Sequence, residues 1–328
     1  MILVTGGAGY VGSHLVMALL ESGKDVIVFD SLELGHIETI ETLKKYGNLK
    51  FVKGNLKNLD DIRGIFMSNK NIDSVVHFAA YSLVEESVKN PQKYYYNNVY
   101  GTLNLLNAML EFGINKIVFS STAATYGEPV YTPIDEKHQQ NPINPYGNSK
   151  LMVEKIMDDY DKAYGLKSVR LRYFNVAGAD SDARIGEWHN VETHLIPNVL
   201  KAKEGKSFKM FGTDYDTPDG TCVRDYINVE DLARAHILAL EYLKNGGETN
   251  FFNLGTKNGN SVKEVFAVCE EVTGNKIPLE ICSRRDGDPA TLVADNKKAK
   301  EIFGWEPVND LKYSVETAFK WETKFNSK

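Results

Sequence analysis

One glycine-rich segment constrains the fold more than any other part of the chain. Residues 5–12 read TGGAGYVG, directly after the apolar run 2–4 and directly before a helical pattern, with the spacing carried by Gly6, Gly9 and Gly12. A strand, a tight glycine turn and a helix N-terminus in this order can hold a pyrophosphate, because glycine lets the backbone approach the ligand and the free N–H groups favour its charge. Tight glycine turns also occur for structural reasons alone, so the prediction of a dinucleotide site needs a second signal, an acidic residue after the next strand.

That acidic residue is Asp30. Residues 25–29 predict a second strand, and Asp30 stands at its end, about 20 residues beyond the glycines, where a dinucleotide-binding unit places an acid. A carboxylate there accepts hydrogen bonds from the adenosine ribose and repels the extra phosphate of NADP, so we expect NAD. The structural alternative for Asp30 is a helix cap or a turn residue.

The composition is that of an ordinary globular protein. Its 328 residues are 42% hydrophobic and 25% charged, with a net charge of −6. This balance predicts no nucleic-acid partner and no polybasic membrane surface, and no apolar run reaches the ~18 residues of a membrane helix. The three cysteines, Cys222, Cys269 and Cys282, lack metal-ligand spacing and predict reduced thiols, so we expect a cytoplasmic protein.

Strand and helix patterns alternate through the first half of the chain. Short apolar runs predict strands at residues 2–5, 25–29, 49–52, 74–78, 116–121 and 168–173. Helical patterns lie between them, notably at 10–21, 60–68, 94–112 and 146–164. Near-continuous apolar strands separated by helices predict an α/β fold with a doubly wound parallel sheet, a Rossmann domain over residues 1–176.

The alternation breaks down after Gly178. Residues 209–224 predict a loop and 225–243 a helix, with shorter elements at 197–203, 251–254, 262–272 and 297–303. We expect a smaller C-terminal α/β substrate lobe over 177–328, with segments near 223–254 returning to the first domain.

Tyr146 and Lys150 form a Y-x-x-x-K pair near the start of a predicted helix. One helical turn separates them, so both side chains lie on one face. An ammonium near a phenol lowers the phenol pKa from about 10 and suits it to act as a general base. The pair follows the hydroxyl cluster 120–122 at a predicted strand end, where ligands of a doubly wound sheet bind. A solvated helix face is the alternative for such a pair.

Several longer motifs make the chain resemble the extended short-chain dehydrogenase/reductase family, and within it the UDP-glucose (UDP-galactose) 4-epimerases. They are TGGAGYVG at 5–12, FSSTAATYG at 119–127, PYGNSK at 145–150, RYFNVAGA at 172–179, VRDYINVEDLA at 223–233 and RRDGDPA at 284–290. The likeness covers essentially the whole chain. It implies a Rossmann domain followed by a sugar-nucleotide-binding lobe.

The resemblance also implies a mechanism. Tyr146 takes the proton of the sugar 4-hydroxyl, Lys150 holds the nicotinamide ribose, and Thr122 hydrogen-bonds the 4-oxygen. NAD accepts the hydride from C4, and the 4-keto sugar rotates and takes the hydride back on its other face. UDP-galactose and UDP-glucose are thereby interconverted, with N-acetylated UDP-sugars as further candidates.

The resemblance extends to the binding residues. It assigns cofactor contacts to Gly6, Gly9, Tyr10, Val11, Gly12, Asp30, Ser31, Asn55, Leu56, Phe78, Ala79, Ala80, Ser82, Asn97, Ser120, Tyr146, Lys150 and Phe174. It assigns substrate contacts to Thr122, Tyr146, Asn175, His194, Leu195, Lys209, Phe211, Arg224, Arg285 and Asp288. For the two arginines, guanidinium forks suit a diphosphate, although isolated surface arginines are the plain alternative.

Three positions depart from the family pattern. Asn55 replaces an aspartate near the adenine, and Ser82 replaces a lysine found in some members near the cofactor phosphates. Thr291 stands where a bulky residue excludes N-acetylated sugars, so its small side chain predicts that they are admitted. Metal ligation is an alternative interpretation of His194, with His189 and Glu192, but no second cluster completes such a site, and no metal is expected.

Other functions differ in identifiable residues. A dehydratase places Asp-Glu directly after the active-site threonine, whereas this chain has Ala123-Ala124. A UDP-glucuronate 4-epimerase or decarboxylase differs mainly around the sugar C6 and stays open. A non-catalytic NAD-binding regulator commonly lacks the Tyr–Lys pair. The resemblance further implies a homodimer, through apolar stripes that we expect on the helices at 94–112 and 146–164 (Leu103, Leu106, Leu110, Val153, Met157 and Tyr160).

Overall fold

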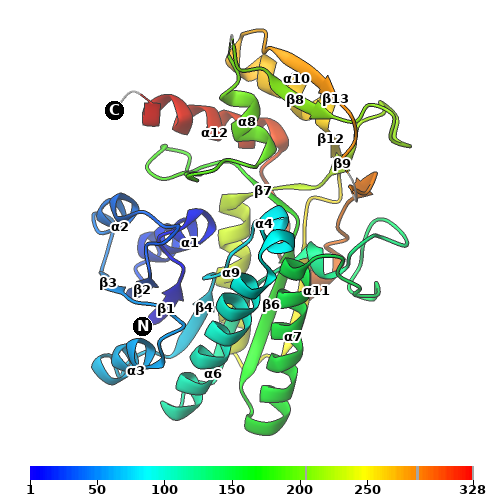
Figure 1. The fold of residues 1–328 in the computed structure, drawn as a ribbon. Helices are drawn as coiled ribbons and strands as arrows, with labels where there is room; N and C mark the ends of the chain where they lie inside the picture. The colour runs from blue at the N-terminus through cyan, green and yellow to red at the C-terminus, as the bar shows by residue number, and fades with distance from the viewer. Residues whose placement is uncertain (204, 286–287, 327–328) are drawn as a thin grey trace. The chain divides into compact units, whose positions relative to one another are not determined.

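The computed structural model describes residues 1–203, 205–285 and 288–326 of the chain. Contacts between Cα atoms divide it into two compact units (Figure 1). The first unit comprises residues 1–128, 139–172 and 233–252. The second unit comprises 129–138, 173–232 and 253–328.

A seven-stranded sheet organises the first unit. Its strand order is β11-β6-β5-β4-β1-β2-β3, and β1 pairs in parallel with both β2 and β4. The bounds are β1 (Ile2–Thr5), β2 (Val26–Asp30), β3 (Leu49–Lys53), β4 (Ser74–His77), β5 (Lys116–Thr122), β6 (Lys167–Tyr173) and β11 (Asn250–Leu254). The order reverses at β1, which is the topological switch of a doubly wound fold. The predicted α/β fold class is confirmed.

Helices connect these strands. They are α1 (Tyr10–Glu21), α2 (Ile37–Leu43), α3 (Leu59–Ser68), α4 (Val84–Lys89), α5 (Pro91–Tyr94), α6 (Gly101–Glu111), α7 (Pro145–Tyr164) and α9 (Val229–Lys244). Their ends follow local chemistry: Asn144 caps α7 by accepting the Gly147 N–H at 2.8 Å, and Gly165 ends it with left-handed φ. The helix expected over 94–112 is confirmed, and its first part forms a π-helical turn, η1 (Tyr95–Tyr100), that joins α5 to α6 without a gap.

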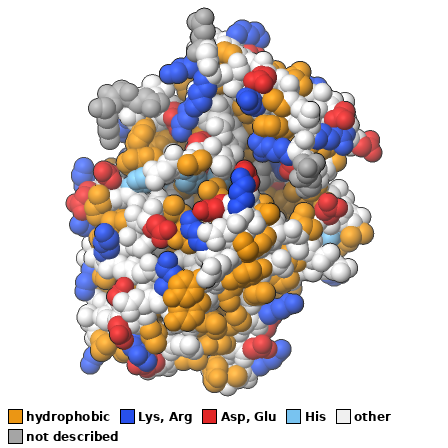
Figure 2. All heavy atoms as spheres, in the orientation of Figure 1, with side chains coloured by type: hydrophobic (Ala, Val, Ile, Leu, Met, Phe, Trp, Pro, Cys, Tyr) orange, Lys and Arg blue, Asp and Glu red, His pale blue; other side chains and the backbone are white. Residues whose placement is uncertain are grey.

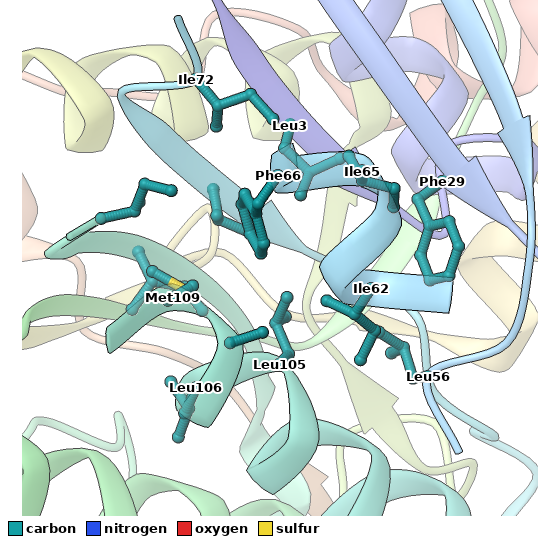
Figure 3. Close-up of a cluster of buried hydrophobic side chains, with 14 of the residues drawn as sticks. Leu3, Phe29, Leu56, Ile62, Ile65, Phe66, Ile72, Leu105, Leu106 and Met109 are labelled. Carbon is teal, nitrogen blue, oxygen red and sulfur yellow. The ribbon is translucent and has the colours of Figure 1, made fainter. Parts of the chain in front are cut away.

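The core of the first unit lies between the sheet and the helices α3 and α6 (Figure 3). Leu3 and Phe29 come from the sheet, Phe66 from α3, and Leu105 and Met109 from α6, and each is at most 2% exposed. Burial of each such side chain contributes about 1.5–3 kcal/mol of hydrophobic free energy. This packing holds the carboxyl ends of β1, β4 and β5 in place beneath the candidate site.

The second unit is built from short strands in three small sheets. Its strands are β7 (Asn175–Ala177), β8 (Phe208–Phe211), β9 (Val223–Arg224), β10 (Tyr226–Asn228), β12 (Asn260–Ser261), β13 (Leu279–Cys282) and β14 (Thr291–Leu292). Its helices are α8 (Leu195–Leu200), α10 (Val262–Thr273), α11 (Lys297–Phe303) and α12 (Leu311–Asn326). A separate core, which includes Ile196, Met210, Val265 and Val315, joins α8, β8, α10 and α12.

Two expectations for this half of the chain are wrong. The loop expected over 209–224 contains β8 and β9, and the first residues of the helix expected over 225–243 form β10. These strands pair with β13, with β12 and β14, and with β7, respectively. Because their partners are up to about 70 residues away, periodicity in a short window does not reveal them. Among the described residues, no helix combines the length and the apolar character that a membrane crossing needs.

Candidate active site

The glycine turn between β1 and α1 is closely packed. Gly6 has a φ of 75°, and a Cβ there would lie 2.6 Å from the Ala79 backbone N. A Cβ on Gly12 would lie 2.3 Å from the Gly6 carbonyl O. Only glycine fits these two positions without moving the backbone.

The N-terminus of α1 is suited to an anion. Gly9 is its cap residue, so no side chain caps the helix, and its first turn carries no acidic residue. No capping side chain therefore binds the N–H groups of the first turn, from Tyr10 to Gly12. Together with the helix dipole they form a seat for a phosphate.

Asp30 ends β2 beside this turn. Its Oδ2 accepts the Ala8 N–H at 3.0 Å and its Oδ1 accepts the Leu32 N–H at 2.9 Å. Burial raises the carboxyl pKa, and the two backbone hydrogen bonds partly offset that rise. An ionised carboxylate offers about four acceptor positions, so about two are left for ribose hydroxyls. The turn and Asp30 thus fit a dinucleotide with an unphosphorylated adenosine ribose.

Other predicted cofactor residues lie at neighbouring strand ends. Phe78, Ala79 and Ala80 follow β4 and are half-buried, and Ser31 follows β2. Asn55 follows β3, where its Oδ1 accepts the Lys57 N–H at 2.9 Å.

The remaining cofactor positions differ in exposure. Leu56 packs its side chain in the core, so only its main chain is available to a ligand. Ser82 is exposed, while Asn97 lies half-buried in η1 and donates to Asn98 Oδ1 at 3.0 Å. Phe174 lies between β6 and β7, and nothing further in its surroundings tests its assignment.

The structure brings Thr122, Tyr146 and Lys150 together at the end of β5. Thr122 lies close enough to Tyr146 to lower the pKa of the phenol, and its Oγ1 accepts the Ala124 N–H at 3.1 Å. Lys150 is 2% exposed, and its Nζ donates to the Ser120 carbonyl O at 2.8 Å. Burial lowers the Lys150 pKa to about 7.

The expected effect of Lys150 on the Tyr146 pKa is wrong for the chain by itself. Burial raises the Tyr146 pKa, and the nearby Thr122 only partly lowers it. The physical reason is that desolvation disfavours the phenolate, while the Lys150 ammonium is held by a backbone carbonyl and is itself destabilised by burial. A further positive charge close to Tyr146 would favour its phenolate.

A buried ion pair supports this group, and motif reasoning missed it. Arg172 on β6 and Glu154 on α7 are each 3% exposed at the side chain. The guanidinium donates to both carboxylate oxygens, at 2.9 and 2.5 Å. Ser121 Oγ donates to the same carboxylate at 2.5 Å, and Arg172 Nη1 donates to Tyr126 OH at 2.9 Å. Glu154 stands four residues after Lys150, and this spacing was the available signal that both side chains lie on the same face of α7.

In the second unit, two of the predicted substrate residues, Arg224 and Asp288, meet at β9, and two others, Arg285 and Phe211, contact each other. Arg224 is 8% exposed; its Nη1 donates to the Pro289 carbonyl O at 2.8 Å and its Nη2 lies 3.2 Å from Asp288 Oδ1. The Arg285 guanidinium lies 3.9 Å from the centre of the Phe211 ring. Residues 286 and 287 of the same segment lie outside the described residues.

The other substrate positions are more dispersed. Lys209 on β8 is exposed and lies 3.9 Å from Glu280. Asn175 on β7 donates its N–H to the Asp225 carbonyl O at 3.0 Å. His194 precedes α8, and Leu195 is its first residue.

Two findings in the second unit were not anticipated. Tyr215 is 5% exposed, its hydroxyl makes no hydrogen bond to the described residues, and Asp288 and Arg224 both shift its pKa, so it lies at the Arg224 cluster. No sequence motif marks it. His189, Glu192 and His194, considered above as metal ligands, do meet, and a fourth residue, Glu187, joins them.

A switch-point glycine turn, an acid after β2 and a Thr–Tyr–Lys group after β5 are typical of NAD-binding short-chain dehydrogenases/reductases. The family model described as GDP-mannose 4,6 dehydratase matches residues 3–318. A UDP-glucose 4-epimerase of Halalkalibacterium halodurans is 53% identical over 323 residues, which cover 98% of this chain and 95% of the relative.

Solved structures agree. A Bifidobacterium longum UDP-glucose 4-epimerase in complex with NAD⁺ and UDP is 39% identical, covers 98% of both chains and has a TM-score of 0.93. A UDP-Glc/GlcNAc 4-epimerase of Campylobacter jejuni is 43% identical, with 98% and 99% coverage and a TM-score of 0.87. The chain belongs to the NAD-dependent epimerase/dehydratase family, the extended short-chain dehydrogenases/reductases, and its resemblance to the UDP-glucose 4-epimerases is confirmed.

Proposed function

We propose that the chain interconverts UDP-galactose and UDP-glucose as an NAD-dependent UDP-sugar 4-epimerase. The observation that carries the proposal is that Thr122, Tyr146 and the buried Lys150 come together at the end of β5, in a chain 53% identical to a UDP-glucose 4-epimerase over nearly its full length. NAD fits the α1 N-terminus and the two spare acceptor positions of Asp30. When bound, it supplies a reversible hydride acceptor and a positive charge.

Within this proposal the residues of the first unit manage one proton. Tyr146 takes it from the sugar 4-hydroxyl and returns it to the 4-oxygen when C4 is reduced again on either face of the ring. Thr122 orients the phenol and hydrogen-bonds the sugar 4-oxygen. Lys150, fixed by the Ser120 carbonyl, binds the cofactor ribose. Burial raises the Tyr146 pKa, and the positive charge of bound NAD would favour the phenolate.

The residues of the second unit are proposed to bind the UDP moiety. Arg224 and Arg285 provide guanidinium donors for the diphosphate. Asp288, which pairs with Arg224 in the described structure, has carboxylate oxygens that suit nucleotide hydroxyls. Asn175, His194, Leu195, Lys209 and Phe211 are proposed as the remaining contacts.

One assay tests the reaction class. The purified chain is given UDP-galactose with no added cofactor, and UDP-glucose is measured. We expect turnover by wild type and a loss of at least about 100-fold in Tyr146→Phe, since a positioned acid–base group contributes about 10²–10⁴-fold. NAD released on denaturation should be equal in both proteins. Full activity of Tyr146→Phe would show that another group is the base.

N-acetylated sugars are a second candidate substrate pair, because of Thr291. This residue is half-buried on β14, and its strand partner is Val223, the neighbour of Arg224. A small side chain there leaves space beside the residues proposed to hold the diphosphate. We expect turnover of UDP-N-acetylglucosamine by wild type and its selective loss in Thr291→Tyr, with UDP-glucose turnover kept. Equal loss of both activities would contradict a gating role for Thr291.

Related reactions are less well supported by these residues. The Asp-Glu pair that a 4,6-dehydratase uses is replaced by Ala123 and Ala124, which form a 3₁₀ turn, η2 (Ala123–Thr125), and have no acid–base chemistry. A UDP-glucuronate 4-epimerase or decarboxylase is tested by adding UDP-glucuronate in the same assay. A regulator without activity is opposed by the complete Thr122–Tyr146–Lys150 group.

We also propose a cytoplasmic homodimer. Leu106, Val153 and Met157, which we expected in the interface stripes, are fully buried in the core of the first unit, so that expectation is wrong in detail. A neighbouring group on η1, α6 and α7 forms an apolar surface hollow, and Figure 2 shows hydrophobic side chains gathered where Figure 1 draws these helices. The hollow is lined by Tyr95, Val99, Tyr100, Leu103 and Met152. The cytoplasmic location is supported by three free cysteines.

A further inference from the structure

A cluster of side chains with atoms that could ligate a metal lies in the loop before α8, within the second unit. Glu187, His189, Glu192 and His194 follow an E-x-H-x-x-E-x-H pattern within eight residues. One ligand atom from each residue lies within 4.8 Å of each of the others. Of the four, only His194 has a place in the proposed function, so the convergence of all four is unexplained.

The distances in the cluster suit a small cation. His189 Nδ1 lies 3.2 Å from Glu187 Oε1 and 3.6 Å from Glu192 Oε1, and His194 Nδ1 contacts the same Glu187 oxygen. Ligands bound tetrahedrally at about 2.0–2.1 Å from zinc stand about 3.3–3.4 Å apart. The two His189 contacts match such edges to within a few tenths of an ångström. His194 Nδ1 lies closer to Glu187 Oε1 than two ligands of one zinc ion do, so this pair must move apart when the ion binds.

The donor set selects the kind of cation. Imidazole nitrogen is a ligand for zinc and other first-row transition metals, whereas Ca²⁺ and Mg²⁺ prefer sites built from oxygen alone. Two carboxylates carry two negative charges and two neutral imidazoles carry none, so one divalent cation makes the cluster neutral. Four protein ligands and no open position describe a structural site.

Hydrogen bonds from the backbone and from a neighbouring tryptophan hold the two glutamates in place. The Glu187 side chain is 6% exposed, and its backbone carbonyl accepts Trp321 Nε1–H at 3.0 Å. Glu192 Oε1 accepts the N–H groups of Thr193 and His194, both at 2.9 Å. Glu192 Oε2 is buried and makes no hydrogen bond to the described residues, although Lys201 Nζ lies 3.6 Å away. Partners that fix first ligands in this way are typical of metal sites.

We infer that Glu187, His189, Glu192 and His194 form a structural binding site for one zinc ion or a similar first-row divalent cation. The ion ties the loop to the start of α8, where His194 is the cap residue. The alternative is a network of ion pairs among the four side chains with no metal. This inference does not depend on the proposed function, because its readouts are metal content and coordination.

The test measures zinc on the intact chain. Protein stripped with a chelator is dialysed against buffered micromolar Zn²⁺, and bound metal is counted by mass spectrometry. We expect one zinc per chain in wild type and at least a tenfold weaker affinity in His189→Gln. Asn190→Ala, an exposed position in the same loop outside the cluster, is the matched control and should bind zinc as wild type does.

A spectroscopic measurement on wild type needs no variant, so poor folding of His189→Gln cannot affect it. It also distinguishes zinc bound by this cluster from zinc bound by cysteine. Co²⁺ in place of Zn²⁺ should give the intense visible bands of tetrahedral coordination without a thiolate-to-cobalt charge-transfer band. No stoichiometric metal in wild type, equal binding by His189→Gln, or a thiolate band would each overturn the inference, and the ion-pair network would stand in its place.

Discussion

The buried Arg172–Glu154 pair offers a quantitative test of how the candidate site is held together. In Glu154→Gln the shape of the side chain is kept, but the Arg172 guanidinium loses its countercharge and faces an amide NH₂ in place of one carboxylate oxygen. Unit charges about 4 Å apart attract by about 4 kcal/mol at an effective dielectric constant of 20. Removing one partner of such a buried pair typically costs about 3–5 kcal/mol. We expect a loss of that size in the free energy of unfolding.

Urea unfolding of the NAD-free chain at pH 7 measures this loss. For a urea dependence of about 2–3 kcal/mol per molar, the midpoint should fall by about 1–2.5 M. Circular dichroism follows both units, whereas the tryptophans, Trp188, Trp305 and Trp321, all lie in the second unit. We therefore expect the unfolding midpoint measured by circular dichroism to fall, and the midpoint measured by tryptophan fluorescence serves as an internal comparison.

The double variant Glu154→Gln with Arg172→Met separates lost charge compensation from lost packing. It removes the unpaired cation, while the amide oxygen introduced at position 154 still accepts the Ser121 hydroxyl, so it should recover at least half of the loss. If the double variant is as unstable as Glu154→Gln alone, the buried charge is not the cause, and the electrostatic reasoning is refuted.

Three further predictions address the cofactor site, the buried lysine and the surface. Gly12→Ala puts a Cβ 2.3 Å from the Gly6 O, so NAD released on denaturation should fall at least tenfold, while Gly64→Ala, which meets no atom within 4 Å, should retain it. Burial lowers the Lys150 pKa from 10.5 to about 7, so between these values the unfolded chain binds a proton that the folded chain lacks. The stability of the NAD-free wild type relative to Lys150→Met should thus rise by about 2–3 kcal/mol from pH 7.5 to 9.5, and a flat or falling difference in urea titrations would contradict the assignment. Met152→Lys in the apolar hollow should convert a dimer into a monomer in size-exclusion chromatography with light scattering, whereas Met67→Lys, at another exposed methionine, should not.

The sequence predicted the first unit well because its signals are local. Each signal can be recognised within a few residues of chain: the short apolar strands, the glycines of residues 5–12 and the acid after β2. The rule that ligands bind at the carboxyl ends of parallel strands then placed Thr122 near Tyr146, and in the structure Thr122 lies close enough to lower the Tyr146 pKa.

The second unit was predicted less well because its strands are short and their partners are distant. Two-residue strands such as β9 and β14 have no periodicity of their own and exist only through pairing with each other. Apolar stripes on α6 and α7 showed which residues avoid water but not whether a sheet or a second chain covers them.

Local patterns in the chain were therefore enough to specify the α/β class and to predict the dinucleotide seat, and the family resemblance predicted the proton-transfer group. Contacts made on folding established that Arg172 neutralises Glu154 beneath that group, that burial raises the Tyr146 pKa, and that Glu187 completes a cluster with two histidines. The difference arises because backbone propensity and side-chain periodicity act between near neighbours, whereas desolvation and charge pairing depend on which distant segments the folded chain brings into contact.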